Sequence, residues 1–229
     1  MKIQALRIAI VGCGTAGPAA AVLLKRQGHE VVLFERATEC KAVGAGFLIQ
    51  PSGMVVLKEL GILNEVLAHA AKVDRLHVLD TAGHTLMDLR YAEIGQGSFG
   101  AGLHRPVLLH HLIQAMREAE VEVRWDWEIE VASRDENHWT LRSTSGEKCS
   151  GFDLLIVADG ARSKLRDLVG TGGVNRGYPW GAHWFIGKNN GIFAENELHQ
   201  VVHGTRRLCG FLATGHDLTA AQIFFCKSG

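Results

Sequence analysis

Three glycines near the start of the chain have the spacing of a turn that binds phosphate. Gly12, Gly14 and Gly17 form the pattern Gly-x-Gly-x-x-Gly. In such a turn the first glycine allows a sharp bend, the second lets backbone approach a pyrophosphate, and the third lets a helix pack closely on a strand. A helix beginning near Thr15 and Ala16 would present free N–H groups and a partial positive charge to a phosphate. The pattern predicts a dinucleotide site.

A carboxylate follows at the distance expected for ribose binding. Glu35 stands 23 residues after Gly12, at the end of the next expected strand. Its oxygens can accept hydrogen bonds from both ribose hydroxyls of an adenosine, whereas a 2′-phosphate would be repelled. NADP is therefore disfavoured at this site, and NAD and FAD remain. An ordinary βαβ unit with chance glycines is the alternative, which the ordered succession of strand, turn, helix, strand and acid disfavours.

The elements that must position these residues are predicted from apolar patterning. Residues 7–11 and 29–34 read as buried parallel strands, and residues 16–27 as the helix between them, ended by Gly28. A second buried strand, 153–157, leads into Asp159 and Gly160 at the edge where open α/β sheets bind ligands. The basic residues that follow, Arg162, Lys164 and Arg166, could contact phosphates or Asp159.

Further elements are expected along the chain. Arg105 and Pro106 open a helix to about residue 119, and Arg105 suits either an anion or a surface ion pair. Ser52 is a candidate N-cap for another helix. Within 44–51 we expect a glycine-rich turn that leads into a short apolar strand ended by Pro51. The other expected elements are a helix at 64–71, a hairpin of 76–80 with 85–89, a β-meander of 121–127, 129–132 and 139–143, a linker at 172–179, and an antiparallel sheet of 183–186, 198–202, 208–212 and 222–225.

Composition narrows the class of protein. The 229 residues include 24 basic and 24 acidic side chains, so no net field favours nucleic acid or an anionic membrane. No apolar run approaches about 18 residues and no signal peptide precedes the first strand, which predicts a cytoplasmic protein. The five cysteines form no CxxC pair and are expected to be reduced thiols. His199 and His203 share a strand face but lack an evident third ligand, so no metal site is predicted.

The sequence resembles the class A FAD-dependent monooxygenases, the para-hydroxybenzoate and salicylate hydroxylase group. The motifs that carry this resemblance follow one another in the order glycine turn, Glu35-Arg36, GAGFLIQP, LHRPVLL and ADGARSKLR. The resemblance implies an α/β fold: a Rossmann-like FAD-binding domain with parallel sheet and β-meander (residues 1–75 and 100–172), plus part of an antiparallel substrate-domain sheet (76–99 and 173–229). It implies that cofactor-binding positions are Gly12, Gly14, Thr15, Ala16, Gly17, Glu35, Arg36, Arg105, Ile129, Asp159 and Gly160.

Within that resemblance, each position has an implied role. The glycines border the FAD pyrophosphate, Glu35 holds the adenosine ribose, and Arg36 lies against the adenosine. Arg105 matches an arginine on the flavin side, and the backbone of Ile129 meets the adenine. Asp159-Gly160 matches the DG motif, DGxxSxxR, which is associated with both FAD and NAD(P)H.

The resemblance also implies a reaction. NAD(P)H would reduce FAD, molecular oxygen would react with the reduced flavin, and a small, electron-rich aromatic substrate would be hydroxylated. No catalytic side chain is identified. The family's downstream Gly-Asp…Ala-Ala-His motif is not found; Gly215-His216-Asp217 lacks its order, and the sequence ends 69 residues after Gly160, which predicts a C-terminally truncated enzyme.

Two other interpretations remain open. The chain could be a catalytically inactive flavin- or nucleotide-binding fragment that self-associates through an open sheet edge. It could also be another flavoprotein of the same fold, such as a reductase or halogenase. A hydrolase or P-loop enzyme is disfavoured because neither Gly-x-Ser-x-Gly nor Gly-x-x-x-x-Gly-Lys-[Ser/Thr] occurs.

Overall fold

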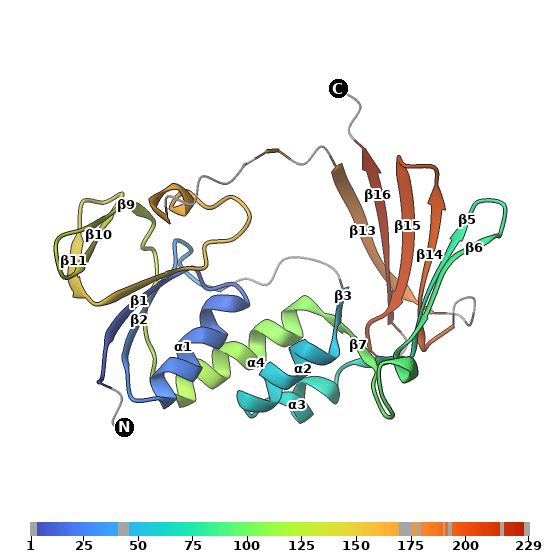
Figure 1. Cartoon of the computed structure of the whole chain (residues 1–229), viewed down its shortest axis with the longest axis horizontal. Coiled ribbons are helices and arrows are strands. Elements are labelled where there is room, and N and C mark those ends of the chain that lie inside the picture. Colours follow the sequence, from blue (N-terminus) through green and yellow to red (C-terminus); the bar gives the residue numbers. More distant parts are fainter. Residues whose placement is uncertain are drawn as a thin grey trace. The chain divides into compact units, whose positions relative to one another are not determined.

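The chain divides into two compact units, each made of two separate segments. The computed structural model describes residues 4–40, 46–169, 176–177, 180–189, 191, 194–215 and 218–226 (Figure 1). One unit comprises Met1–Lys41 and Leu109–Val174, and the other comprises Ala42–Leu108 and Asn175–Gly229. The expected FAD-binding domain includes 42–75 and 100–108, which pack with the second unit instead. The functional division of the chain therefore stays a prediction.

The first unit is built on a four-stranded parallel sheet. Its strands are β1 (Arg7–Val11), β2 (Glu30–Phe34), β8 (Glu122–Arg124) and β12 (Leu154–Val157), in the order β12-β1-β2-β8. Helix α1 (Ala16–Arg26) connects β1 to β2. The apolar residues of β1 and β2 are almost fully buried, as parallel strands covered on both faces require. The predicted βαβ unit is confirmed.

A three-stranded antiparallel meander completes this unit, but its composition differs from the prediction. It contains β9 (Ile129–Arg134), β10 (Trp139–Ser143) and β11 (Lys148–Phe152). The expected first strand, β8, instead pairs in parallel with β2. Phe34, Trp127 and Phe152 are buried together, with ring centroids of Phe34 5.1 Å from Trp127 and 5.8 Å from Phe152. This aromatic core joins the meander to the parallel sheet.

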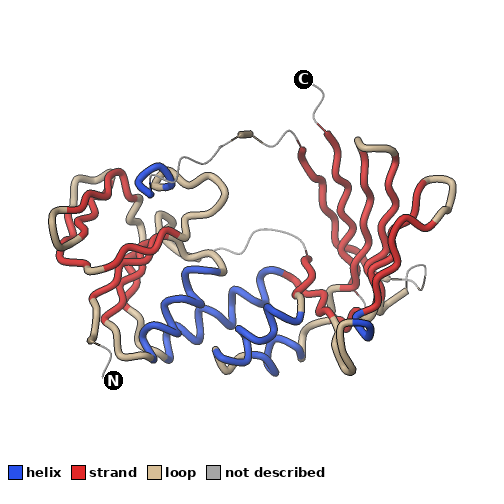
Figure 2. Tube along the Cα trace, viewed as in Figure 1, coloured by secondary structure: helices blue, strands red, loops and turns tan. Residues whose placement is uncertain are grey.

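The helices follow the predicted pattern with two corrections (Figure 2). Helix α4 (Arg105–Glu118) begins where expected. In α2 (Pro51–Glu59) the N-cap is Gln50 and not Ser52, because Pro51 occupies the first helical turn. The expected helix at 64–71 is shorter, since α3 (Leu63–Leu67) ends before strand β4 (Ala71–Val73). Two single-turn 3₁₀ helices, η1 (Tyr91–Glu93) and η2 (Arg166–Val169), are also present.

The second unit contains two sheets. A six-stranded sheet has the order β13-β16-β15-β14-β5-β6, and a three-stranded sheet has the order β3-β7-β4. The expected antiparallel strands and hairpin are confirmed, and β5 joins β14 in parallel to merge them into one sheet. The strands are β3 (Gly46–Ile49), β4 (Ala71–Val73), β5 (Arg75–Asp80), β6 (Thr85–Arg90), β7 (Gly100–His104), β13 (Trp180–Lys188), β14 (Glu197–His203), β15 (Arg207–Ala213) and β16 (Leu218–Cys226).

Two expectations fall partly on residues outside the described ranges. The linker at 172–179 is described only at 176–177, and Gly44 and Ala45 of the GAGFLIQP stretch lie in an undescribed range. The described cysteines Cys13, Cys40, Cys149 and Cys209 are free thiols. Among the described residues, no helix has both the length and the hydropathy of a membrane span.

Gly102 in β7 is a position where the second unit tolerates no side chain. A Cβ there would overlap the carbonyl oxygen of Ala213 and lie 3.2 Å from Cδ1 of Leu212. We expect Gly102→Ala to lower the free energy of unfolding by about 2 kcal/mol, because β7 would have to move away from the strand that contains Ala213, β15. Urea unfolding checks this. The matched variant Gly187→Ala, in β13 with no described atom within 4 Å, should change stability by less than about 0.5 kcal/mol; equal losses would contradict the account.

Candidate nucleotide-binding site

The carboxyl ends of β1, β2 and β12 surround a pocket in the first unit. The pocket has a volume of about 190 Å³. Complete sites for drug-sized ligands measure roughly 300–1,000 Å³, so this pocket suits one part of a dinucleotide and not the whole molecule. Residues predicted from the sequence that line it are Gly12, Gly14, Glu35, Arg36, Ile129, Asp159 and Gly160.

The glycine turn explains how β1 and α1 approach so closely. Gly12 has a φ of 106°, and a Cβ on it would collide with the carbonyl of Ala158, the residue after β12. A Cβ on Gly17 would overlap the carbonyl oxygen of Gly12. Gly14 differs, because no described atom lies within 4 Å of the position that its Cβ would occupy. Two glycines are thus required by the fold itself, and the third leaves space beside the backbone.

The N-terminus of α1 retains hydrogen-bonding capacity. Its N-cap, Thr15, forms no side-chain capping bond, and the first turn holds no acidic residue. The early N–H groups of a helix have no partner within the helix, and the helix dipole favours an anion there. Thr15, Ala16 and Gly17 therefore stand at a terminus suited to phosphate, although they do not line the pocket itself.

Backbone donors hold the Glu35 carboxylate in one orientation. Cys13 N–H donates to Oε2 at 2.6 Å, and Ala37 N–H donates to Oε1 at 3.0 Å. Each carboxylate oxygen can accept a further hydrogen bond, so both remain able to receive a ribose hydroxyl. The thiol of Cys13 is buried, and this burial raises its pKa, which keeps it a neutral part of the turn.

The Asp159-Gly160 segment closes the pocket on the β12 side. Gly160 has a φ of 86°, and Asp159 Oδ2 accepts a hydrogen bond from Lys164 N–H at 3.2 Å. The Lys164 ammonium lies 2.6 Å from Glu128 Oε1, and this hydrogen bond with its charge lowers the pKa of Glu128. Of the three basic residues after Gly160, Arg162 and Lys164 line the pocket, and Lys164 also pairs with Glu128. Arg166 instead donates to the carbonyl of Ala161.

The apolar wall of the pocket comes from the aromatic core. Phe34, Trp127 and Ile129 line it, beside Arg36 at the end of β2. Such a wall suits the flat face of a base. The sequence alone does not identify Trp127 and Glu128 as pocket residues. They reach the pocket because the backbone N–H of Trp127 donates to the carbonyl oxygen of Glu35 at 2.9 Å, a contact between residues far apart in the chain.

For two positions considered in the sequence analysis, the structure gives no place in the pocket. Arg105 begins α4 and belongs to the second unit, so the structure gives it no position relative to the pocket. The late candidate Gly215-His216-Asp217 includes residues 216 and 217, which lie outside the described ranges.

Comparison with known proteins shows one consistent family. Residues 5–203 match the family described as "FAD binding domain". A relative from Rhodococcus erythropolis, "Probable 2-heptyl-3-hydroxy-4(1H)-quinolone synthase AqdB2", is 31% identical, over 87% of this chain and 52% of its own length. The 3-hydroxybenzoate 6-hydroxylase of Klebsiella oxytoca is 28% identical, over 72% of this chain and 43% of its own length.

The fold agrees with this relationship. The solved structure of PqsL from P. aeruginosa, in complex with 2-aminobenzoylacetate, matches with a TM-score of 0.79 and 25% identity. The match covers 98% of this chain and 62% of PqsL. This chain spans about half the length of the curated relatives that it matches, or less.

Proposed function

Because the chain belongs to the FAD-binding-domain family, we propose that its first unit holds the adenosine diphosphate half of FAD and that it acts in a flavin-dependent monooxygenase. The observation that carries the proposal is that one pocket is lined by both an unfilled position beside Gly14 and an oriented Glu35 carboxylate, and that helix α1 begins directly after this glycine turn. These features match the pyrophosphate and ribose of a dinucleotide.

Different residues of the pocket would bind different parts of the cofactor. Gly14 and the first turn of α1 would receive the pyrophosphate, and Glu35 would accept the ribose hydroxyls. Arg36 and Ile129 would lie beside the adenosine, with Asp159 and Gly160 on the β12 side. FAD, when bound, supplies the redox chemistry, while the protein binds, orients and excludes water. Arg105 is proposed for the flavin side.

For the whole enzyme we propose hydroxylation of a small aromatic substrate. One oxygen atom of O₂ would enter the substrate, the other would leave as water, and NAD(P)H would supply the two electrons. The relatives named for quinolone synthesis and for 3-hydroxybenzoate hydroxylation support this substrate class. The cytoplasm is the proposed location, supported by the four free cysteines among the described residues.

An oxidation assay tests the reaction separately from cofactor binding. The FAD-loaded chain should oxidise NADH or NADPH faster when a phenol, an aromatic acid or a quinolone is added, with oxygen consumed in step. If the chain binds FAD but no such compound raises the rate above background, the monooxygenase proposal fails for this chain while the FAD site stands.

The exposed edges of the six-stranded sheet support a second candidate, a non-catalytic FAD-binding fragment that self-associates. β6 is exposed at every residue and includes Leu86 and Leu89, and the other edge strand, β13, exposes Phe185. Unpaired edges with apolar side chains favour pairing with another chain. Size-exclusion chromatography with light scattering should then give a dimer or larger species. A monomer at all concentrations would exclude this candidate.

A further inference from the structure

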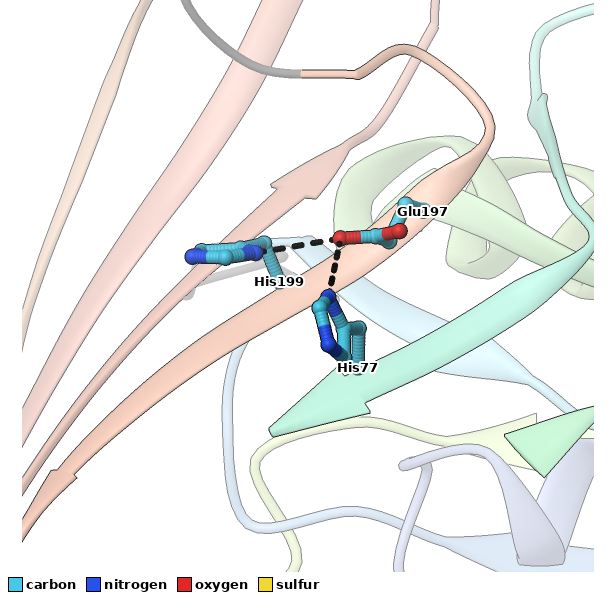
Figure 3. A group of neighbouring side chains, drawn as sticks. All are labelled: His77, Glu197 and His199. Atoms are coloured by element: carbon cyan, nitrogen blue, oxygen red, sulfur yellow. Dashed lines mark hydrogen bonds and ion pairs between the residues drawn. The ribbon is translucent and has the colours of Figure 1, made fainter. Parts of the chain in front are cut away.

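Two histidines and a glutamate from separate parts of the chain meet on one face of the six-stranded sheet. His77 lies on β5, and Glu197 and His199 lie on β14 (Figure 3). The parallel pairing of these strands sets His77 directly opposite His199. Alternate residues of a strand share a face, so Glu197 points to the same side. All three belong to the second unit, separate from the nucleotide pocket.

The distances between these side chains are those between the ligands of one metal ion. Glu197 Oε1 lies 3.3 Å from His77 Nδ1 and 3.0 Å from His199 Nδ1. The candidate ligand atoms of the three residues all lie within 4.8 Å of one another. A tetrahedral Zn²⁺ with bonds of about 2.0–2.1 Å separates its ligand atoms by roughly 3.3 Å. An ion could therefore enter with only small movements of the rings.

The group is sheltered yet accessible. The side chains of His77, Glu197 and His199 are 16%, 11% and 27% exposed. The two imidazole rings meet edge to face, with centroids 5.7 Å apart. These values leave a route for an ion from solvent while removing most of the water from the carboxylate.

Neighbouring groups hold the ligands in place. Arg75 Nη1 lies 3.0 Å from Oε2 of Glu197, which leaves Oε1 directed at the two histidines. Asp88 on β6 in turn holds Arg75, at 2.6 and 2.9 Å. The second nitrogen of His77, Nε2, lies 3.3 Å from Thr85 Oγ1, so a bond from Nε2–H to this hydroxyl would leave Nδ1 free for a metal. Such outer contacts orient ligands in known metal sites.

The charged groups around the cluster balance one another. Arg75 and Arg90 contribute two positive charges, and Asp88 and Glu197 contribute two negative charges. Each histidine offers one ring nitrogen to an ion, and Glu197 offers a carboxylate oxygen.

We propose that His77, Glu197 and His199 bind a divalent transition-metal ion, with Zn²⁺ the best match to two imidazoles and one carboxylate. The ion would link the β5–β6 hairpin to β14. Because the protein supplies three ligands, one position of a four-coordinate ion would remain for water. His77 is brought to His199 by strand pairing and so gives no signal in the sequence, whereas Glu197 lies two residues before His199 on the same strand. His203 lies outside the group.

Isothermal titration calorimetry of the 229-residue chain with ZnCl₂, after removal of metal with a chelator, tests the proposal. We expect one Zn²⁺ per chain and a rise in the thermal midpoint when zinc is added. His77→Ala and His199→Ala should each weaken binding at least about tenfold. Glu197→Gln keeps a hydrogen-bond acceptor of the same size, so it should fold normally and still lose affinity.

His203→Ala is the matched control, since His203 is exposed at the far end of the same strand. It should bind zinc as the unaltered chain does. Circular dichroism without metal confirms that each variant folds. The proposal is overturned if the unaltered chain takes up no zinc, or if the folded Glu197→Gln variant binds zinc as tightly as the unaltered chain; the cluster would then be a hydrogen-bonded group only.

Discussion

Replacing Glu35 with alanine should lower the affinity of the chain for FAD on the order of 100-fold. Each hydrogen bond from a ribose hydroxyl to a carboxylate contributes about 1.5–3 kcal/mol, so losing two costs roughly 3 kcal/mol or more. The N–H groups of Cys13 and Ala37 already orient the carboxylate, so ordering it costs little free energy when the ligand binds. Quenching of FAD fluorescence measures the change.

Two further variants separate the charge of Glu35 from general damage. Glu35→Gln keeps one acceptor and should give an intermediate loss. Glu136→Ala removes an exposed acid from the turn between β9 and β10 of the same unit and should leave FAD affinity unchanged. If Glu35→Ala and Glu136→Ala bind FAD equally well, the ribose is not held at Glu35.

Gly17→Ala should destabilise the chain strongly, by about 3 kcal/mol or 6–12 °C in the thermal midpoint. The added Cβ would overlap the carbonyl oxygen of Gly12, so α1 would have to move away from β1. The same variant should lose FAD binding, because the N-terminus of α1 moves with the helix. Calorimetric unfolding and a FAD titration measure the two effects.

Gly14→Ala is the matched variant that distinguishes a folding role from a binding role. No described atom lies within 4 Å of the added Cβ and Gly14 does not have a positive φ, so stability should stay within about 0.5 kcal/mol. Affinity for FAD should nevertheless fall about 10- to 100-fold, because the methyl group would enter the space proposed for the pyrophosphate. Unchanged FAD affinity in this variant would argue against a pyrophosphate beside Gly14.

Local patterns carried most of what could be predicted about the first unit. The turn from Gly12 to Gly17, the strands around it and Glu35 lie within thirty residues, where spacing and composition constrain geometry directly. The neighbour of each strand in a sheet was harder to predict. β8 was correctly expected as a strand but was assigned to the meander, because periodicity does not reveal which strand lies beside it. β11 was missed, since Lys148, Ser150 and Gly151 give little strand signal.

Contacts between distant segments could not be predicted from the sequence. The group of His77, Glu197 and His199 depends on a parallel pairing between β5 and β14, in which paired residues are 122 positions apart in the sequence. Spacing along one strand identified His199 and His203 as neighbours on a face, but it could not supply His77. Likewise, the approach of Glu128 and Lys164 beside the pocket follows from tertiary packing.

The most direct test of the central claim is a visible absorption spectrum of the purified 229-residue chain, after FAD is added and free cofactor is removed by gel filtration. We expect a protein fraction that retains a flavin spectrum at about one FAD per chain. ADP should displace the cofactor because the pocket recognises that half of FAD. A colourless, correctly folded protein would show that the first unit does not hold the adenosine diphosphate half of FAD.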